Sequence, residues 1–442
     1  MTGGGGQGSP ESAWPPAARG WTAVALLALA SIVSQWDRTV INLMVGPIKA
    51  EFALDDTQFA ALQGIAFGIF YVLACIPIGR IADRWSRTTL IGIALASWSL
   101  FAMASGLVRG YWQLFATRIG VAVGEASLTP AGLSMLADLF PPARLGRPVG
   151  AFLMSSPVGQ GLAFIGGGAL LQWLTVSPVA TTGPLAALAP WQVAFVLIGA
   201  PGLLLVPAFL LLREPERRGR AAVEAPPPAR EVIGVFVSRR ATLLPMFAGF
   251  AMVPLVSYAF GIWTPALFQR TWGWDPAQVG LAFGLILLVF GTAGAYFGGW
   301  LSDHFTRRGH ADAPLRAATY GFAGCGVFGA AAPLMPTAEA ALLLLAPAVF
   351  LSNMPYACAG TAIQLITPNR ARAQVTALYI TITTLVGLAV GPLVVGLMTD
   401  RVFHDPADIR YSLAIVVGGA APMLVGLLSL ARRPYRALRS AQ

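Results

Sequence analysis

Long apolar segments dominate this chain of 442 residues. Each is about 20 residues or longer, the length that an α-helix needs to cross the hydrocarbon core of a bilayer. A transmembrane barrel would show segments of about 10 residues with alternating polarity instead. Only 11% of the residues are charged, against about 25% in soluble domains. We therefore predict an all-α membrane protein with twelve transmembrane helices in two six-helix bundles. The predicted spans are 21–45, 58–80, 88–108, 111–138, 147–174 and 190–212, followed by 241–268, 276–301, 314–335, 338–362, 373–398 and 411–431.

The spans divide the chain into two halves joined by a polar connector. The connector contains the Pro-rich segment AVEAPPPAR, which is expected to be stiff. The segment GRIADRWSR follows the second span and GGWLSDHFTRR follows the eighth, which indicates an internal duplication. The predicted parts are a disordered cytoplasmic tail (1–20), the first bundle (21–212), a cytoplasmic connector (213–240), the second bundle (241–431) and a basic cytoplasmic tail (432–442).

The basic residues predict how the chain is oriented. Most of the 29 Lys and Arg residues fall in loops that share one side with both termini, and the positive-inside rule makes that side cytoplasmic. We expect a multi-pass protein of the inner membrane. The net charge of +10 does not indicate nucleic-acid binding, because the charge lies in short loops between spans. Lys49 is the single Lys and is not in a GK[ST] context, so no Walker A loop is present.

Four charged residues interrupt the first and fourth spans: Asp37, Arg38, Arg118 and Glu125. A charge at the bilayer centre costs at least about 2.5–3.5 kcal/mol, and such residues mark ion or substrate paths. From the rise of 1.5 Å per residue, all four fall at a similar depth, so we expect them to pair with one another. One interpretation is a purely structural salt-bridge quartet. The other is that Asp37 or Glu125 exchanges a proton while the neighbouring Arg switches between a carboxylate and an anionic substrate.

The loop after the second span, GRIADRWSR, resembles the signature loop of the major facilitator superfamily. The resemblance implies a cytoplasmic gate that latches the two halves in one state, with Gly79 allowing close helix approach. Asp138, at the inner end of the fourth span, is a plausible partner for Arg84 or Arg87. The alternative is positive-inside anchoring alone. The expected gate residues here are Gly79, Asp83, Arg84, Arg87 and Asp138, with Asp303 in the second copy.

A Gly/Pro-rich segment in the eleventh span, GLAVGPLVVG, resembles another motif of the same superfamily. Gly391 and Pro392 would break the regular helix, and small residues permit tight packing. The segment is either a bend with a role in conformational change or an ordinary packing motif.

The fourth span carries the most specific motif. It reads Arg118-Ile-Gly-Val-Ala-Val-Gly-Glu125-Ala-Ser and ends in Ala-Asp138-Leu-Phe. Together with Asp37-Arg38, this pattern closely resembles the spinster family of lysophospholipid and sphingosine-phosphate transporters, and the chain would be a bacterial homologue. These family-specific motifs lie only in the first half.

The second half has no charged residue near mid-depth. Its polar candidates are Tyr258, Asn353, Tyr356, Gln364 and Tyr379, each of which serves either helix packing or ligand contact. A charged first half facing an apolar second half would make an amphipathic cavity, which suits a substrate with an anionic head and an alkyl tail.

We expect a secondary transporter that moves an amphipathic anionic lipid by alternating access, coupled to protons, and acts as a monomer. Arg38 and Arg118 would engage the head group, and Asp37 and Glu125 would carry the proton. The first alternative is a proton-coupled carrier of small organic anions or drugs on the same fold. A receptor or scaffold is a further alternative. We do not expect an enzyme, because no HExxH or GxSxG motif occurs and no His lies in a span, and we expect neither a cofactor nor a metal.

Overall fold

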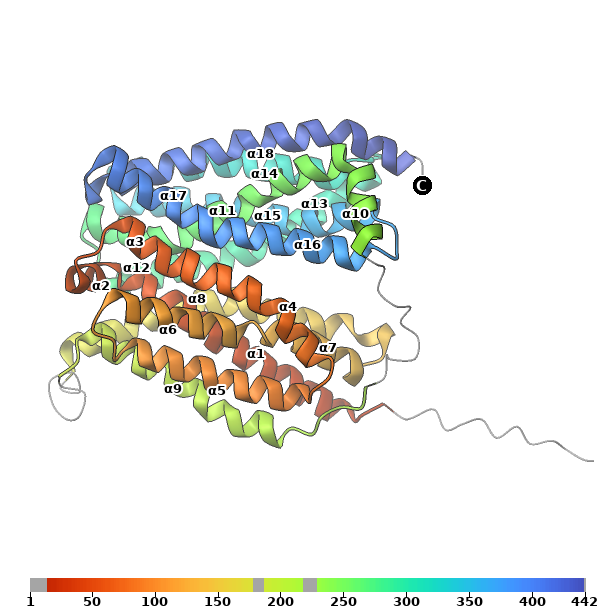
Figure 1. Cartoon of the computed structure of the whole chain (residues 1–442). Coiled ribbons are helices and arrows are strands. Elements are labelled where there is room, and N and C mark those ends of the chain that lie inside the picture. Colours follow the sequence, from red (N-terminus) through yellow and green to blue (C-terminus); the bar gives the residue numbers. More distant parts are fainter. Residues whose placement is uncertain (1–13, 178–186, 218–228, 441–442) are drawn as a thin grey trace, which may run out of the picture.

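The computed structural model describes residues 14–177, 187–217 and 229–440, and these form helices joined by short connections (Figure 1). Twelve helical spans in this part of the chain are long and apolar enough to cross a membrane, which confirms the predicted all-α class. The predicted tail 1–20 lies mostly outside the described residues, and the first helix begins at Ala17. Residues 218–228 of the predicted connector also lie outside them.

The first bundle contains six spans, several of them built from two helical pieces. The helices are α1 (Ala17–Thr39), α2 (Val45–Phe52), α3 (Asp56–Ala61), α4 (Phe70–Ala82), α5 (Arg87–Ser105), α6 (Tyr111–Glu125), α7 (Leu128–Leu139), α8 (Gly146–Val176) and α9 (Pro190–Leu211). Helix α10 (Ala229–Ser238) lies in the connector, where the sequence indicated only a stiff Pro-rich link.

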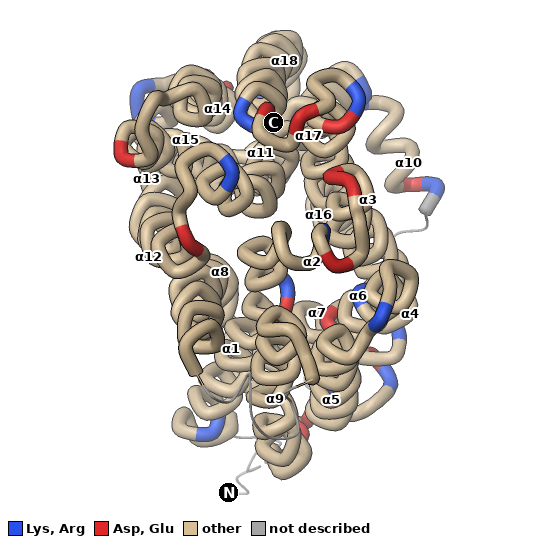
Figure 2. Tube along the Cα trace, turned by 90° about the vertical axis from the view of Figure 1, so that its left-hand side faces the viewer, with Lys and Arg blue, Asp and Glu red and all other residues tan. Residues whose placement is uncertain are grey.

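The second bundle repeats this layout. Its helices are α11 (Arg240–Trp272), α12 (Pro276–Ile286), α13 (Thr292–Arg307), α14 (Ala313–Ala331), α15 (Ala338–Ile366), α16 (Arg372–Leu385), α17 (Gly391–Met398) and α18 (Ile409–Ser440). Helix α18 runs straight through the predicted basic tail as far as Ser440. Figure 2 shows the two groups of helices end-on, one above the other.

The duplication is visible in how two equivalent spans begin. Asp55 caps α3 by accepting a hydrogen bond from the Gln58 backbone N–H at 2.6 Å, and Asp275 caps α12 by accepting from the Gln278 N–H at 2.8 Å. In both cases the Gln side chain reaches back to the backbone N–H of the Asp, which completes a capping box. The second and eighth spans therefore start with the same local structure.

The start of α1, the end of α18 and helix α10 lie at one end of the bundle (right in Figure 1). We call this the terminal end and the opposite end the distal end. The two bundles pack closely toward the distal end. A Cβ built on Gly280 would lie 2.3 Å from the Phe164 carbonyl oxygen, and one on Gly64 would lie 2.6 Å from the Leu388 carbonyl oxygen. Only glycine permits such backbone contact between the halves.

The described residues contain four short π-helical segments: Thr399–Phe403 at the end of the eleventh span, and three others where the halves meet. The three others are Leu62–Ile69 in the second span, Leu287–Gly291 in the eighth and Val386–Val390 in the eleventh. Segments of this kind are rare and are frequent at functional sites. The backbone of these three spans is therefore irregular at the depth where the bundles face each other.

Candidate functional site

The four predicted charged residues meet between α1 and α6, the first and fourth spans. Asp37 and Arg38 occupy the last turn of α1, and Arg118 and Glu125 lie on α6. Asp37, Arg118 and Glu125 are each only 1% exposed, whereas 24% of the Arg38 side chain is exposed. The structure thus brings the predicted residues together and leaves Arg38 the most accessible of them.

One ion pair lies at the centre of this cluster. Arg38 Nε donates a hydrogen bond to Glu125 Oε2, and Ser34 Oγ, one turn earlier on α1, donates to the same oxygen at 2.7 Å. The other carboxylate oxygen of Glu125 has no hydrogen-bond partner among the described residues. Ser34 and Arg38 on one face of α1 therefore both bind the same oxygen of the Glu125 carboxylate.

Arg118 is held differently from Arg38. Its Nη1 donates to the Asp37 backbone carbonyl at 3.0 Å, and its Nη2 donates to Gln63 Oε1 at 3.1 Å. Neither oxygen of the Asp37 carboxylate has a hydrogen-bond partner in the described part of the chain. The expectation that all four charges pair with one another is therefore wrong, because a backbone carbonyl and an amide take the place of the second carboxylate.

Two amides that the sequence analysis did not single out connect this cluster to the second bundle. Gln63 Nε2 donates to Asn42 Oδ1 at 2.6 Å, and Asn42 Nδ2 donates to the Gly261 carbonyl on α11 at 3.2 Å. Gln63 and Asn42 are each 5% exposed. A hydrogen-bonded chain thus runs from the Arg118 guanidinium across the interface between the halves.

Aromatic rings of the second span lie over the guanidinium groups of Arg38 and Arg118. The Arg38 guanidinium carbon lies 4.6 Å from the Phe67 ring centroid and 4.9 Å from that of Tyr71, and Arg118 lies 5.5 Å from Phe67. Phe67 and Tyr71 stack with centroids 5.8 Å apart. Such contacts stabilise cations by about 0.5–2 kcal/mol, and they help to hold the Arg38 guanidinium in place.

The predicted polar residues of the second half lie in different settings. Tyr258 packs against the core cluster that contains Phe67, so it faces the charged site. Tyr356 is 43% exposed. Asn353 donates to the Val349 carbonyl of its own helix at 2.8 Å, as a packing group would. Gln364 lies eight residues beyond Tyr356 on α15, or about 12 Å along the axis, and is not part of the central cluster.

A second buried network lies at the terminal end. Arg87, which is 1% exposed, forms an ion pair with Asp138 through Nη1, and its Nε donates to Glu214 at 2.8 Å. The predicted pairing of Asp138 with Arg87 is confirmed, whereas Glu214 was not foreseen. Arg87 and Asp138 belong to the first bundle and Glu214 to the start of the connector, so in this conformation the network does not join the two bundles.

Glu214 is held by more than one donor. Burial alone would raise its pKa, but hydrogen bonds from the Thr88 backbone N–H and the Arg87 side chain lower that pKa below the ordinary value of 4.5. Just beyond it, Arg217 donates to the carbonyls of Ala82 at 2.9 Å and Trp85 at 2.6 Å, and also to that of Asp83. The start of the connector is thereby fastened to the signature loop.

The remaining predicted gate residues lie in different settings. Arg84 and Asp303 are exposed. No atom lies within 4 Å of a Cβ built on Gly79, so the expected close helix approach at this glycine is absent from this conformation. Gly391 and Pro392 directly follow a π-helical segment, and the Pro392 carbonyl accepts a hydrogen bond from Trp263 Nε1 at 2.9 Å.

A third charged cluster, not foreseen from the sequence, joins the halves at the distal end. Arg270 of α11 donates to both oxygens of Asp56 at 2.7 Å, and Lys49 also pairs with Asp56, which is 0% exposed. Asp400, near the end of the eleventh span, accepts from the Thr57 backbone N–H at 2.7 Å and from the Thr57 hydroxyl at 2.6 Å. Ionic and hydrogen-bonded contacts thus keep the bundles closed at this end.

Among the described residues, no group of three His, Cys, Asp or Glu side chains could hold a metal ion. The three cysteines are free thiols.

The fold and the charged site define a membrane transporter, and comparison with known proteins gives the family. The model of the Major Facilitator Superfamily matches residues 27–392. The chain belongs to this superfamily, as its signature loop indicated, and is a multi-pass membrane protein.

Similar proteins have several different names. An MFS-type efflux pump of Mycolicibacterium smegmatis is 29% identical over 95% of this chain and 94% of that protein. The "Probable L-galactonate transporter" of Escherichia coli is 25% identical, covering 93% and 89%. Protein spinster homolog 1 of Homo sapiens is 28% identical, covering 86% and 72%. The predicted resemblance to the spinster family is confirmed by these relatives.

Solved structures support the same fold. A crystal structure of a bacterial homologue of the human lysosomal transporter spinster, in an inward-facing and unoccupied conformation, superimposes with a TM-score of 0.78. It covers 98% of each chain at 24% identity. At that identity the likeness concerns the fold alone.

Proposed function

We propose that this spinster-like transporter moves an amphipathic anionic lipid, such as a lysophospholipid, by alternating access and in exchange with or together with protons. It would act as a monomer in the inner membrane, with both termini in the cytoplasm. The observation that carries the proposal is the ion pair between the partly exposed Arg38 and the buried Glu125, beside a buried Asp37 carboxylate without a hydrogen-bond partner among the described residues.

The proton site follows from the cost of burying charge. An ionised carboxylate removed from water without donors costs several kcal/mol more than its protonated form. With Asp37 protonated, the two arginines and Glu125 sum to +1, and with Asp37 ionised the cluster is neutral. Proton binding at Asp37 therefore makes the cluster attractive to an anion, and Glu125 is a second proton acceptor once Arg38 leaves it.

The substrate head group would bind at Arg38. This guanidinium is partly exposed and forms its one recorded ion pair through Nε with Glu125. Its other nitrogens have no carboxylate partner among the described residues and could bind a phosphate. Arg118 supplies a second positive charge 5.5 Å from the shared Phe67 ring. The apolar second half, with Tyr258 and Tyr356 as its polar positions, would take the alkyl tail; Asn353 and Gln364 would contact substrate only in other conformations.

The closed distal end supports an assignment of this conformation within the proposed transport cycle. With the termini in the cytoplasm, contact between the bundles at the distal end makes this the inward-facing state. The gate at the terminal end would form in the opposite state. Its residues would be Gly79, Asp83, Arg84, Arg87, Asp138 and Asp303, and Gly391 and Pro392 would bend the eleventh span.

Flux of labelled lysophospholipid in proteoliposomes, with and without a pH gradient, tests this function. We expect Asp37→Asn and Glu125→Gln each to reduce gradient-driven flux at least about tenfold, which corresponds to about 1.4 kcal/mol. Asp408→Asn and Glu339→Gln make the same chemical changes outside the site and should leave flux unchanged. Mass spectrometry should recover the substrate chemically intact. A pH dependence that persists in both site variants would overturn proton coupling.

A proton-coupled carrier of small organic anions is the second candidate, because one relative is named as an L-galactonate transporter. The charged cluster alone would bind a small carboxylate as readily as a lipid head group. Competition separates the two candidates: inhibition of lysolipid flux by other lysolipids, but not by millimolar small carboxylates, supports the lipid. The reverse pattern supports the small anion.

A further inference from the structure

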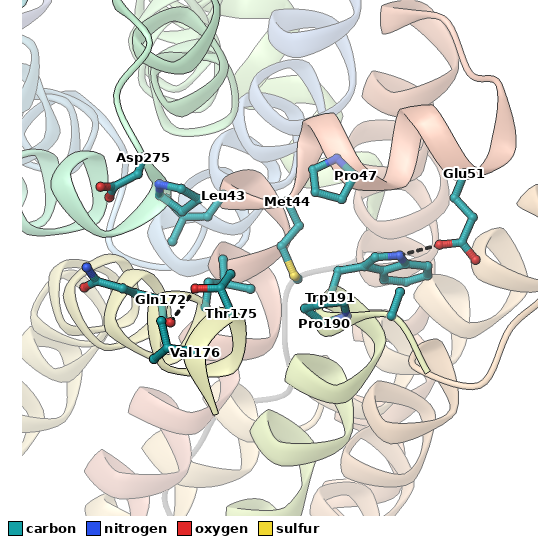
Figure 3. A pocket seen from close by; sticks show the side chains of 13 residues that line it. Leu43, Met44, Pro47, Glu51, Gln172, Thr175, Val176, Pro190, Trp191 and Asp275 are labelled. Carbon is teal, nitrogen blue, oxygen red and sulfur yellow. Dashed lines mark hydrogen bonds between the residues drawn. The ribbon is translucent and has the colours of Figure 1, made fainter. Parts of the chain in front are cut away.

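A pocket of about 500 Å³ lies at the distal end, away from the central cluster (Figure 3). Its floor and walls are apolar, from Leu43, Met44, Leu171, Val176 and Pro190 of the first bundle and Pro276 of the second. A volume of this size accommodates a drug-sized molecule or an alkyl chain. Neither the proton site nor the proposed head-group site uses any of these residues.

The charged groups of the pocket are all acidic. Glu51 and Asp275 line it from opposite sides (Figure 3), and no described lining residue is basic. Lys49, the nearest basic residue along the chain, is paired with Asp56. One oxygen of Glu51 accepts a hydrogen bond from Trp191 Nε1 at 2.6 Å, and the indole ring lines the same pocket. A carboxylate beside an aromatic ring is a favourable environment for an ammonium group.

We infer that this pocket is a second binding site, and that it takes an amphipathic organic cation. The apolar body of such a molecule would fill the cavity, and its ammonium group would lie beside Glu51. The central cluster has the opposite preference, since its exposed charged group is Arg38. The two sites therefore select ligands of opposite charge.

The position of the pocket also determines what its ligand does. Leu43 and Leu171 belong to the first bundle, and Asp275 and Pro276 to the second, so the complete pocket exists only while the bundles are closed at the distal end. A ligand that binds one conformation shifts the population toward it. A cation bound here would hold the transporter in the distally closed state and slow the cycle. The slowing of transport rests on the proposed alternating access, whereas binding of the cation to the pocket does not.

Calorimetric titration of the protein in phosphatidylcholine nanodiscs with dodecyltrimethylammonium tests the site, with empty nanodiscs as the blank for partition into lipid. Thr175→Trp places an indole in the exposed part of the lining and should weaken binding at least about tenfold by filling space. Glu51→Gln should weaken it about threefold, the loss expected of a partly exposed ion pair. Val402→Trp and Asp408→Asn make matched changes at the same end outside the pocket and should have no effect.

Saturable binding of the cation that follows this pattern, with dodecyl sulfate failing to bind at the same site, supports the proposal. Equal binding by all four variants, or equal binding of dodecyl sulfate, overturns it. Flux measured separately then tests the consequence: the cation should lower the maximal rate in the unmodified protein and not in Thr175→Trp. Normal binding without inhibition would count against alternating access through this state and would leave the site itself intact.

Discussion

Replacing Arg270 with glutamine should loosen the distal closure of the two bundles. The change removes two charge-assisted hydrogen bonds to Asp56, both 2.7 Å long. Each bond to a charged group contributes about 1.5–3 kcal/mol. Because Lys49 still neutralises the buried Asp56 carboxylate, the lower value applies, giving about 3 kcal/mol in total. That loss corresponds to about a 100-fold shift toward the distally open conformation.

Spin-label distances across the distal end measure this shift. A cysteine at Trp112 in the first bundle and one at Val402 in the second, each more than half exposed, would carry the labels in a background without native cysteines. We expect a single short distance in the reference protein and a substantial population at longer distance in Arg270→Gln. Arg410→Gln is the matched control, because Arg410 donates a hydrogen bond to the hydroxyl of its neighbour Tyr411, a contact that crosses no interface.

The result that would refute this reasoning is specific. If Arg270→Gln remains folded and keeps the short distance, the ion pair does not hold the bundles together. Equal opening in Arg410→Gln would mean that loss of distal positive charge, and not loss of the Asp56 contact, causes the change.

Two further predictions concern the packing of the halves and the terminal network. Gly280→Leu should open the distal end in the same distance assay, because a Cβ at position 280 would clash with the Phe164 carbonyl oxygen. Gly46→Leu should leave the end closed, because the space around Gly46 is open. Short distances in both variants would contradict the role assigned to Gly280. Because the folded-state pKa of Glu214 is depressed, its contribution to stability is present above its ordinary value of 4.5 and is lost as the pH falls through the folded-state value. Thermal unfolding should therefore show an acid-dependent loss in the unmodified protein that is smaller in Glu214→Gln, and identical pH profiles would be evidence against the network.

The transmembrane spans could be predicted from the sequence because hydropathy is a local property. The predicted second, fourth and sixth spans, 58–80, 111–138 and 190–212, lie close to the observed Asp56–Ala82, Tyr111–Leu139 and Pro190–Leu211. The larger misses come where polar residues continue a helix past the bilayer, as in α18, which runs to Ser440. Hydropathy detects the end of the apolar stretch and not the end of the hydrogen-bonded helix.

The central site was partly predictable for a different reason. Depth along a helix follows from the rise per residue, so the meeting of Arg38 with Glu125 could be anticipated. Rotation about each helix axis could not, and it leaves the Asp37 carboxylate without a hydrogen bond from Arg118. The contact between Asp56 and Arg270 joins residues 214 positions apart and depends on which ends of the bundles are closed. A conformational state is not encoded in local sequence patterns.

The hydrogen-bonded chain through Gln63 and Asn42 explains how the charged site can affect the contact between the bundles. Arg118 donates to Gln63, Gln63 to Asn42, and Asn42 to the Gly261 carbonyl on α11. An anion bound near Arg118 would compete for its Nη2 donor and leave the Gln63 side-chain oxygen without a donor. A buried amide that loses one partner costs about 1–3 kcal/mol, and rotation of Gln63 to recover it would release Asn42 from the second bundle. Occupancy of the site would thus weaken one tie between the halves, which is the coupling that alternating access requires.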